Sequence, residues 1–550
     1  MKNNMKSLRA HAVGFVCVSL MSISTTFAGT AAADLKKPIM NQDLPAVVPA
    51  VDAPSSASLP FYTPTWKIGD PMTLANGKVT VDINERIRVE VRNNTFDFSD
   101  SKNHVTDDTF VLQRVRLGVK VDPVDWVSVY AQGQDSRELF SERGNVPFQF
   151  GAEGDDGFDL YQGYVDLGNK SKFPVTARFG RQVLSYGDER LIGGFDWNNF
   201  GRTFDAAKMT YFIDGPTTTS VDGFIANVVT QEGHNRDENS DFDFNESNNR
   251  DVFAGIYATS KIISFQKTEV YALYRGKDGQ GPEYNATGGT GLLPVNTAYD
   301  VDQDIWTFGA RMQSTSPGRL KGFDYTFEGA YQTGTVSAVQ ATGATFPGIV
   351  GGTSVVNPVR SQGREHLAYA VHAESGYNWE LTPWTPRLGV EYNYASGDDN
   401  AGDNKSGTFM NLFPTNHKFY GYMDVFSWKN MQNAAMTLTA KPNTKTTLRM
   451  DYHAFWLADG GDALYRANGV TQVRAANAAS RNSGKFVGTE FDFTASYAHT
   501  KYLNFLIGYS HFFAADYLQG TQNTATTSNA PISPAGDDAD FFYFQTVLKL

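Results

Sequence analysis

The sequence of 550 residues has only one cysteine, Cys17, and it lies in an apolar segment near the amino terminus. Without a second cysteine, the chain has no disulfide framework, and no catalytic thiol or thiolate metal site is expected in the mature protein. Beyond the amino terminus there is no apolar run of about 18 residues, which argues against a helical membrane protein. The formal net charge of -12 argues against nonspecific binding to nucleic acid.

Catalytic signatures are also missing. The nine histidines form no His-Glu-x-x-His motif or paired metal spacing, and we find no Gly-x-Ser-x-Gly elbow, phosphate loop or nucleotide fingerprint. We therefore expect no enzyme activity and no cofactor. Two acidic stretches could offer oxygen ligands to calcium, but neither has the full spacing of a calcium loop, so we expect both to be solvated. They contain Asp237, Asp241, Asp243 and Glu246 in one stretch, and Asp398, Asp399 and Asp403 in the other.

The amino-terminal segment has the organisation of a secretory signal. Lys2, Lys6 and Arg9 precede the apolar run "AVGFVCVSLMSISTTFA", which ends in small residues. This pattern predicts a signal peptide at residues 1–28, with cleavage as late as residue 33. Residues 34–72 are rich in proline, which disfavours both helix and sheet, and we interpret them as a periplasmic linker.

What the chain does have is aromatic residues and glycine: 39 Phe, 26 Tyr and 51 Gly. This composition favours strands and turns. In "VLQRVRLGVKVD", residues 111–122, apolar and basic residues alternate, as they do on the two faces of a strand. The same alternation predicts about 18 strands, at 77–92, 109–122, 125–137, 158–168, 174–183, 203–213, 218–230, 250–260, 267–276, 303–316, 322–333, 364–377, 385–396, 432–441, 444–457, 487–499, 502–514 and 540–550.

The connections between these strands alternate in length. Short links such as 122–125, 441–445 and 499–502 alternate along the chain with long polar connections such as 231–249 and 397–431. Short periplasmic turns and long extracellular loops are typical of a transmembrane antiparallel β-barrel. Residues 77–550 are therefore predicted to form an all-β barrel of about 18 strands, surrounded by lipid in the outer membrane of a Gram-negative cell. Trp126, Trp384 and Trp456 lie at or near strand ends, where its aromatic girdles would place them; the alternative for each is an ordinary half-buried tryptophan.

A barrel of this size leaves a lumen that side chains from the wall cannot fill. Seven basic residues have inward parity and would line it: Arg86, Arg88, Arg114, Arg116, Lys120, Arg178 and Lys208. Guanidinium groups bind carboxylates through paired donors, so this basic stripe could attract an anionic solute. The alternative is a structural ladder in which the basic residues are neutralised by Glu90, Asp166, Glu328, Glu374, Glu490 and Asp492.

Two longer blocks resemble a known family. "GRQVLSYGDERLIGGFDWNNFGRTFDAAK", 180–208, and "SGDDNAGDNKSGTFMNLFPTNHKFYGYMD", 396–424, are similar to signature segments of the bacterial alginate export family. The closing "DDADFFYFQTVLKL" resembles its last strand. The resemblance implies an 18-stranded barrel with an electropositive constriction that passes an anionic polysaccharide. By matching position it implies site residues Arg181, Asp188, Arg190, Trp197, Arg202 and Asp205 in the first block, and Asn416, His417 and Tyr420 in the second.

These observations predict a channel that passes an anionic polysaccharide or a sugar-like solute without covalent chemistry. A periplasmic secretion partner is compatible with export. One alternative is a general or nutrient-uptake porin for small solutes. An alternative of another class is a surface-binding protein or an enzyme that uses the long loops.

Overall fold

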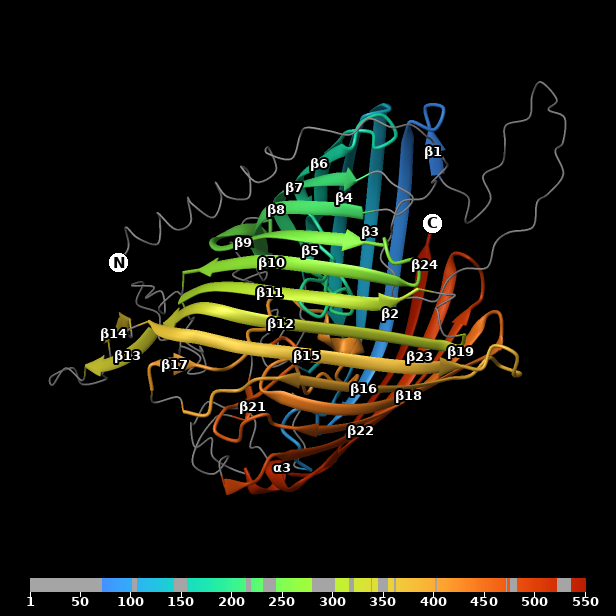
Figure 1. Cartoon of the computed structure of the whole chain (residues 1–550). Coiled ribbons are helices and arrows are strands. Elements are labelled where there is room, and N and C mark those ends of the chain that lie inside the picture. Colours follow the sequence, from blue (N-terminus) through green and yellow to red (C-terminus); the bar gives the residue numbers. More distant parts are fainter. Residues whose placement is uncertain are drawn as a thin grey trace.

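The fold is a closed antiparallel β-barrel, seen in a computed structural model that describes residues 72–100, 106–142, 156–213, 219–230, 244–278, 302–315, 321–337, 339–344, 355–360, 363–400, 403–470, 472–474, 482–521 and 536–550. Eighteen strands follow one another around the wall in chain order. The first wall strand pairs with the last, so the blue and red ends of the barrel lie side by side in Figure 1. The predicted signal peptide and all of the predicted linker except Met72 lie outside the described residues.

The wall strands are β2 (Val79–Asn93), β3 (Asp108–Val124), β4 (Val127–Leu139), β5 (Asp156–Leu167), β6 (Val175–Gln182), β7 (Phe204–Ile213), β8 (Thr219–Thr230), β9 (Glu246–Ser260), β10 (Gln266–Lys277), β11 (Asp302–Ser314), β12 (Phe323–Ser337), β15 (Arg364–Asn378), β16 (Arg387–Ala395), β18 (Met431–Asn443), β19 (Thr446–Trp456), β22 (Phe486–Ala498), β23 (Leu503–Ala514) and β24 (Ala539–Lys549). Each predicted strand is found, and its ends lie within a few residues of the prediction. The largest differences are the start of β9 and the end of β12.

The alternation of short and long connections is confirmed. Tight turns join β3 to β4 and β18 to β19, and they lie at the same end of the barrel as the start of β2 and the end of β24. The connections at the opposite end carry short elements that alternation did not predict, because each spans too few residues to show a period. These elements are β13 (Val339–Ala344), β14 (Val355–Arg360), β17 (Lys405–Ser406), β20 (Leu464–Tyr465), β21 (Gln472–Arg474), the 3-10 helix η2 (Asn416–Lys418) and α3 (Asp516–Gly520). At the turn end, the short strand β1 (Met72–Leu74) pairs antiparallel with the first residues of β2.

The two faces of the wall have the predicted polarity. On β16, Val390 is 58% exposed on the outer face, whereas Asn393 is fully buried on the inner face. On β19, Tyr452 is 45% exposed and Asp451 is buried. An apolar outer face is what lipid requires, and a polar inner face lines the lumen. No helix among the described residues is long and apolar enough to cross a membrane.

Candidate functional site: two loops inside the lumen

Two loops from the long-loop end fold into the lumen and join there. One connects β6 to β7 and the other connects β16 to β18, and we call residues 183–203 and 403–430 the lumen insert. Ile192 and Phe413 form a parallel bridge between the loops. The Gly193 amide donates to the Phe413 carbonyl at 2.8 Å, and the Phe413 amide donates to Leu191 at 2.8 Å. The two blocks that carried the family resemblance therefore form one structural unit.

Apolar packing holds the insert against the wall. Phe413 makes edge contacts with Phe204 of β7 and Phe253 of β9, with ring centroids 5.2 and 4.9 Å apart. Phe426 stacks on Phe455 of β19 at 4.0 Å. All of these rings are buried, so their apolar area favours the inserted position of the loops. The inner face of the barrel is thus apolar where the insert packs, which the alternation of polar and apolar residues did not predict.

The basic residues of β2 and β3 lie on the inner face of the wall, where the insert covers most of them. Asp196 is the centre of this contact: its backbone carbonyl accepts from Arg86 at 2.6 Å, and its carboxylate lies 3.1 Å from Arg114 and 2.7 Å from Arg116. Arg88 donates to the Trp197 carbonyl at 2.8 Å, and its guanidinium lies 3.9 Å from the Trp197 ring centroid. These four arginines are buried against the insert and do not face open water.

The charge of Asp196 is maintained by its surroundings. Burial alone would raise the pKa of this carboxyl, but Arg114, Arg116 and Arg86 outweigh that effect and hold the pKa well below its usual range. Asp196 therefore stays ionised at any physiological pH, and its ion pairs hold residues 195–201 in contact with the arginines. The family resemblance did not mark this residue, although it is the only carboxylate in "FDWNNFG".

A second anchor fastens the insert to the opposite part of the wall. Arg190 lies 3.0 Å from the Glu391 carboxylate and donates to the Tyr420 hydroxyl at 3.1 Å, and its guanidinium lies 3.9 Å from the Phe419 ring centroid. The side chain of Arg190 is almost fully buried. Next to it, Asp188 forms an ion pair with Arg311 of β11. Burial raises the pKa of Asp188, but Arg311 has the larger combined effect and the pKa is lowered.

The remaining residues of the two blocks also meet inside the insert. Trp197 stacks on His417 at 3.7 Å, and His417 Nδ1 lies 3.0 Å from the Asp424 carboxylate. Asn416 donates to the Ala467 carbonyl at 2.6 Å. Arg202 donates to the carbonyls of Gly193 and Pro414 at 3.1 and 2.9 Å. Burial and Arg275 lower the pKa of Arg202 to about 10, so it remains charged at neutral pH.

Comparison with known proteins shows which family the fold and insert belong to. A profile of the family described as alginate export matches residues 78–530. The chain belongs to the alginate export family. It is therefore an outer-membrane channel, and its barrel lies in the outer membrane, with the turn end in the periplasm. No curated protein sequence matches the chain.

Solved outer-membrane proteins have similar overall structures. OpdK from Pseudomonas aeruginosa is 9% identical with a TM-score of 0.48, and the alignment covers 86% of this chain and 98% of OpdK. OccAB1 from Acinetobacter baumannii is 13% identical with a TM-score of 0.48, and the alignment covers 88% of this chain and 98% of OccAB1. OccAB4 from the same organism is 10% identical with a TM-score of 0.49, and the alignment covers 86% of this chain and 98% of OccAB4.

One residue assigned to the pore lining is in a different place. Arg181 lies on the outer face of β6, on the same side as Phe179, which is 46% exposed. There it forms paired hydrogen bonds with Asp205 of β7, at 2.9 and 3.1 Å. The assignment of Arg181 to the lumen is therefore wrong. Successive residues of a strand point to opposite faces, so a motif match cannot place all of its residues in the lumen. The partner of Arg181, Asp205, shares the outer position.

Some residues of the insert had no marked role in the sequence. Asn199 is fully buried and donates to the Gln113 and Arg137 carbonyls at 3.1 Å each, which ties the insert to β3 and β4. Glu490, predicted to neutralise wall arginines, accepts a hydrogen bond from the Met423 amide at 2.9 Å instead. Gly421 has a φ of +81° and its Cβ position is 2.3 Å from a Glu490 carboxylate oxygen, so only glycine fits there.

The acidic stretches have no metal-binding cluster in the part of the chain that the structure covers. No three side chains of His, Cys, Asp or Glu come together there in a way that could hold an ion. Asp398 and Asp403 accept hydrogen bonds from the nearby amides of Asn400 and Lys405. Asp237, Asp241 and Asp243 lie outside the described residues, so the expectation that this stretch is solvated and holds no calcium stays a prediction.

The insert should make stability depend on alkaline pH through Lys429. Burial lowers the pKa of this lysine to about 8 despite the opposing effect of Asp462. Because the pKa is higher in the unfolded chain, unfolding takes up a proton between about pH 8 and about pH 10.4, and the free energy of unfolding should rise over this window by up to about 3 kcal/mol. We expect Lys429→Met to remove this rise, measured as the melting temperature between these pH values. Equal slopes in both proteins would contradict the assignment.

Proposed function

We propose that this channel passes an anionic saccharide, either a polysaccharide or a shorter sugar acid, along the basic side of its lumen. One observation carries the proposal: guanidinium groups of Arg86, Arg88, Arg114 and Arg116 converge on one short segment inside the lumen. That segment supplies a single carboxylate, and its other contacts with the arginines are backbone carbonyls and an amide oxygen. The family name, alginate export, agrees with an anionic polysaccharide as cargo.

The chemistry of these contacts suits transient binding. Guanidinium groups bind carboxylates more strongly than neutral carbonyls, through paired and charge-assisted hydrogen bonds. A passing carboxylate can therefore compete with the carbonyls of Asn198 and Phe200 for arginine donors. Several weak sites in sequence permit conduction, because the solute is attracted but also released.

The proposal is tested by single-channel recording in planar bilayers. We expect anion preference under a salt gradient, and block by oligouronates but not by neutral oligosaccharides of equal length. In the double variant Arg114→Gln, Arg116→Gln the block should weaken about tenfold, the value of one charge-assisted hydrogen bond. Arg181→Gln on the outer face is the matched control and should behave as the unchanged protein.

Other results would point to the alternatives. Cation preference that the double variant leaves unchanged would mean that these arginines only brace the wall. Equal passage of neutral and acidic sugars, measured by liposome swelling, would indicate a general porin. An intact barrel that conducts nothing would indicate a surface-binding protein.

A further inference from the structure

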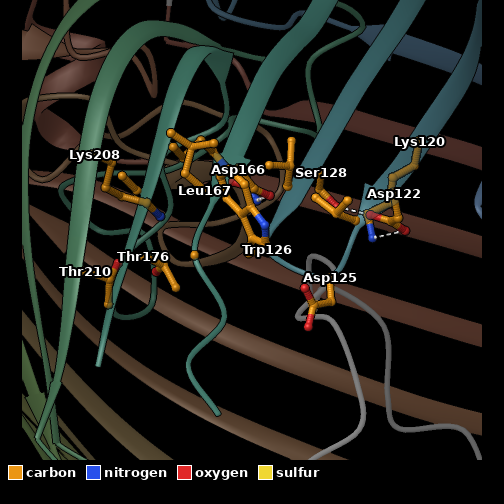
Figure 2. A pocket seen from close by; sticks show the side chains of 15 residues that line it. Lys120, Asp122, Asp125, Trp126, Ser128, Asp166, Leu167, Thr176, Lys208 and Thr210 are labelled. Atoms are coloured by element: carbon orange, nitrogen blue, oxygen red, sulfur yellow. Dashed lines mark hydrogen bonds and ion pairs between the residues drawn. The ribbon is translucent and has the colours of Figure 1, made fainter. Parts of the chain in front are cut away.

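A second group of the predicted lumen residues surrounds a hollow at the turn end of the barrel, away from the contacts of the insert. The hollow has a volume of about 450 Å³ and lies against strands β3 to β7 (Figure 2). Ser128, Asp166, Arg178 and Lys208 form one row across β4, β5, β6 and β7. Their neighbours along the strands, such as Phe179 and Met209, are exposed on the outer face, so this row faces the lumen. A volume of this size is within the range of small-molecule sites.

The carboxylates of the hollow are already occupied. Asp166 accepts two hydrogen bonds from Arg178, at 2.6 and 2.8 Å. Asp122 accepts from Lys120 at 2.9 Å and also from the Ser128 hydroxyl. Asp125 forms an ion pair with Lys172 of the neighbouring turn. The carboxylates of the hollow therefore already have partners within the protein.

Its donors are not all satisfied. The Lys208 ammonium lies 4.0 Å from an Asp222 oxygen that already accepts the Tyr186 hydroxyl at 2.9 Å. Among the described residues, Lys208 makes no hydrogen bond, and the side chains of Thr176, Thr210 and Trp126 make none either. These four side chains line the hollow and are labelled in Figure 2, and they contribute an ammonium, two hydroxyls and an indole N–H to its lining.

Trp126, which the sequence placed at a strand end and in the aromatic girdle, lines the hollow and is 55% exposed. A ring with an open face beside hydroxyl and ammonium donors suits a pyranose, whose faces are apolar and whose edges carry acceptors. The Arg178 guanidinium is directly opposite Lys208 in the strand register, so two cations adjoin at this position.

We infer that this hollow is a binding site for a carboxylate-bearing sugar at the periplasmic mouth of the channel. Lys208 binds the carboxylate, Thr176 and Thr210 bind hydroxyl groups of the sugar, and Trp126 covers a face of the ring. The inference rests on the proposed function and deepens it, since it names the site at which an acidic saccharide first meets, or last leaves, the wall on the periplasmic side.

The test is equilibrium binding to the purified full-length barrel in detergent, with glucuronate, glucose and acetate as probes. We expect glucuronate to bind more tightly than either of the others, with a change in tryptophan fluorescence that is lost in Trp126→Phe. Lys208→Gln should weaken glucuronate binding about tenfold, while Lys208→Arg retains most of it. Lys445→Gln is the matched control and should have no effect, because this exposed lysine lies on the turn between β18 and β19, at the same end of the barrel but outside the hollow.

The outcomes separate this inference from the proposed function. Absent glucuronate binding, or binding that Lys208→Gln leaves unchanged, overturns the site even when bilayer recordings show anion preference. Acetate binding as tight as glucuronate binding overturns the sugar part of the inference. Two results together would support the site and contradict the proposed function. In that case glucuronate binding depends on Lys208, but the channel prefers cations and is not blocked by oligouronates. If Lys208→Gln does not fold, glucuronate binding is measured in Thr210→Val and Trp126→Phe, which should also weaken it.

Discussion

Replacing residues 195–201 by two glycines should raise the single-channel conductance several-fold and increase anion preference. The segment occupies part of the lumen, and its removal frees space for ions. It also withdraws Asp196 and the carbonyls from Arg86, Arg88, Arg114 and Arg116, so that the exposed guanidinium groups attract anions.

Asp196→Asn is the matched comparison for this deletion, because it removes the charge but keeps the segment. Here we expect a gain in anion preference with little change in conductance. Folding of each barrel is checked by its heat-modifiable electrophoretic mobility. A folded deletion variant with unchanged conductance would mean that ions pass through another part of the lumen.

Replacing Arg190 by methionine should detach the insert from the wall on the side of β15 and β16. The change leaves the Glu391 carboxylate buried without its main cationic partner, and breaking a buried pair in this way costs about 3–5 kcal/mol. We expect faster proteolysis within residues 184–203 and larger current fluctuations, while the barrel itself stays folded because its wall hydrogen bonds are unchanged.

Two further variants test the cause. Arg190→Met combined with Glu391→Met should recover part of the protection, since no charge is then left buried alone. Lys120→Met removes an ion pair in which both side chains are more than one third exposed, and should cost less than about 1 kcal/mol. Equal proteolysis of Arg190→Met and the unchanged protein would show that apolar packing alone holds the insert.

The arginines of β2 and β3 show which features of the lumen the sequence can predict and which it cannot. Period-two alternation predicts that Arg114 and Arg116 face inward, and they do. It does not indicate what lies opposite them, because that contact joins residues about 80 positions apart in the chain. The same holds for Arg190 and Tyr420, and for Trp197 and His417, whose partners lie on a different loop.

The prediction for Arg181 was wrong for a related reason. A motif match assigns a residue to a site as a block, whereas a strand directs successive residues to opposite faces. Arg178 and Arg181 are separated by an odd number of positions, so only one of them reaches the lumen. Strand parity, applied within the motif, would have corrected the assignment.

The sequence by itself determined the barrel, its strand number and which face of each strand meets lipid, because these follow from local alternation and from the lengths of the connections. Tertiary structure alone decided that two loops enter the lumen, that Asp196 and Arg190 anchor them, and that Lys208 lies beside a hollow at the other end with Asp222 as an ion-pair partner at 4.0 Å. Those outcomes depend on contacts between segments far apart in the chain, and no local pattern records such contacts.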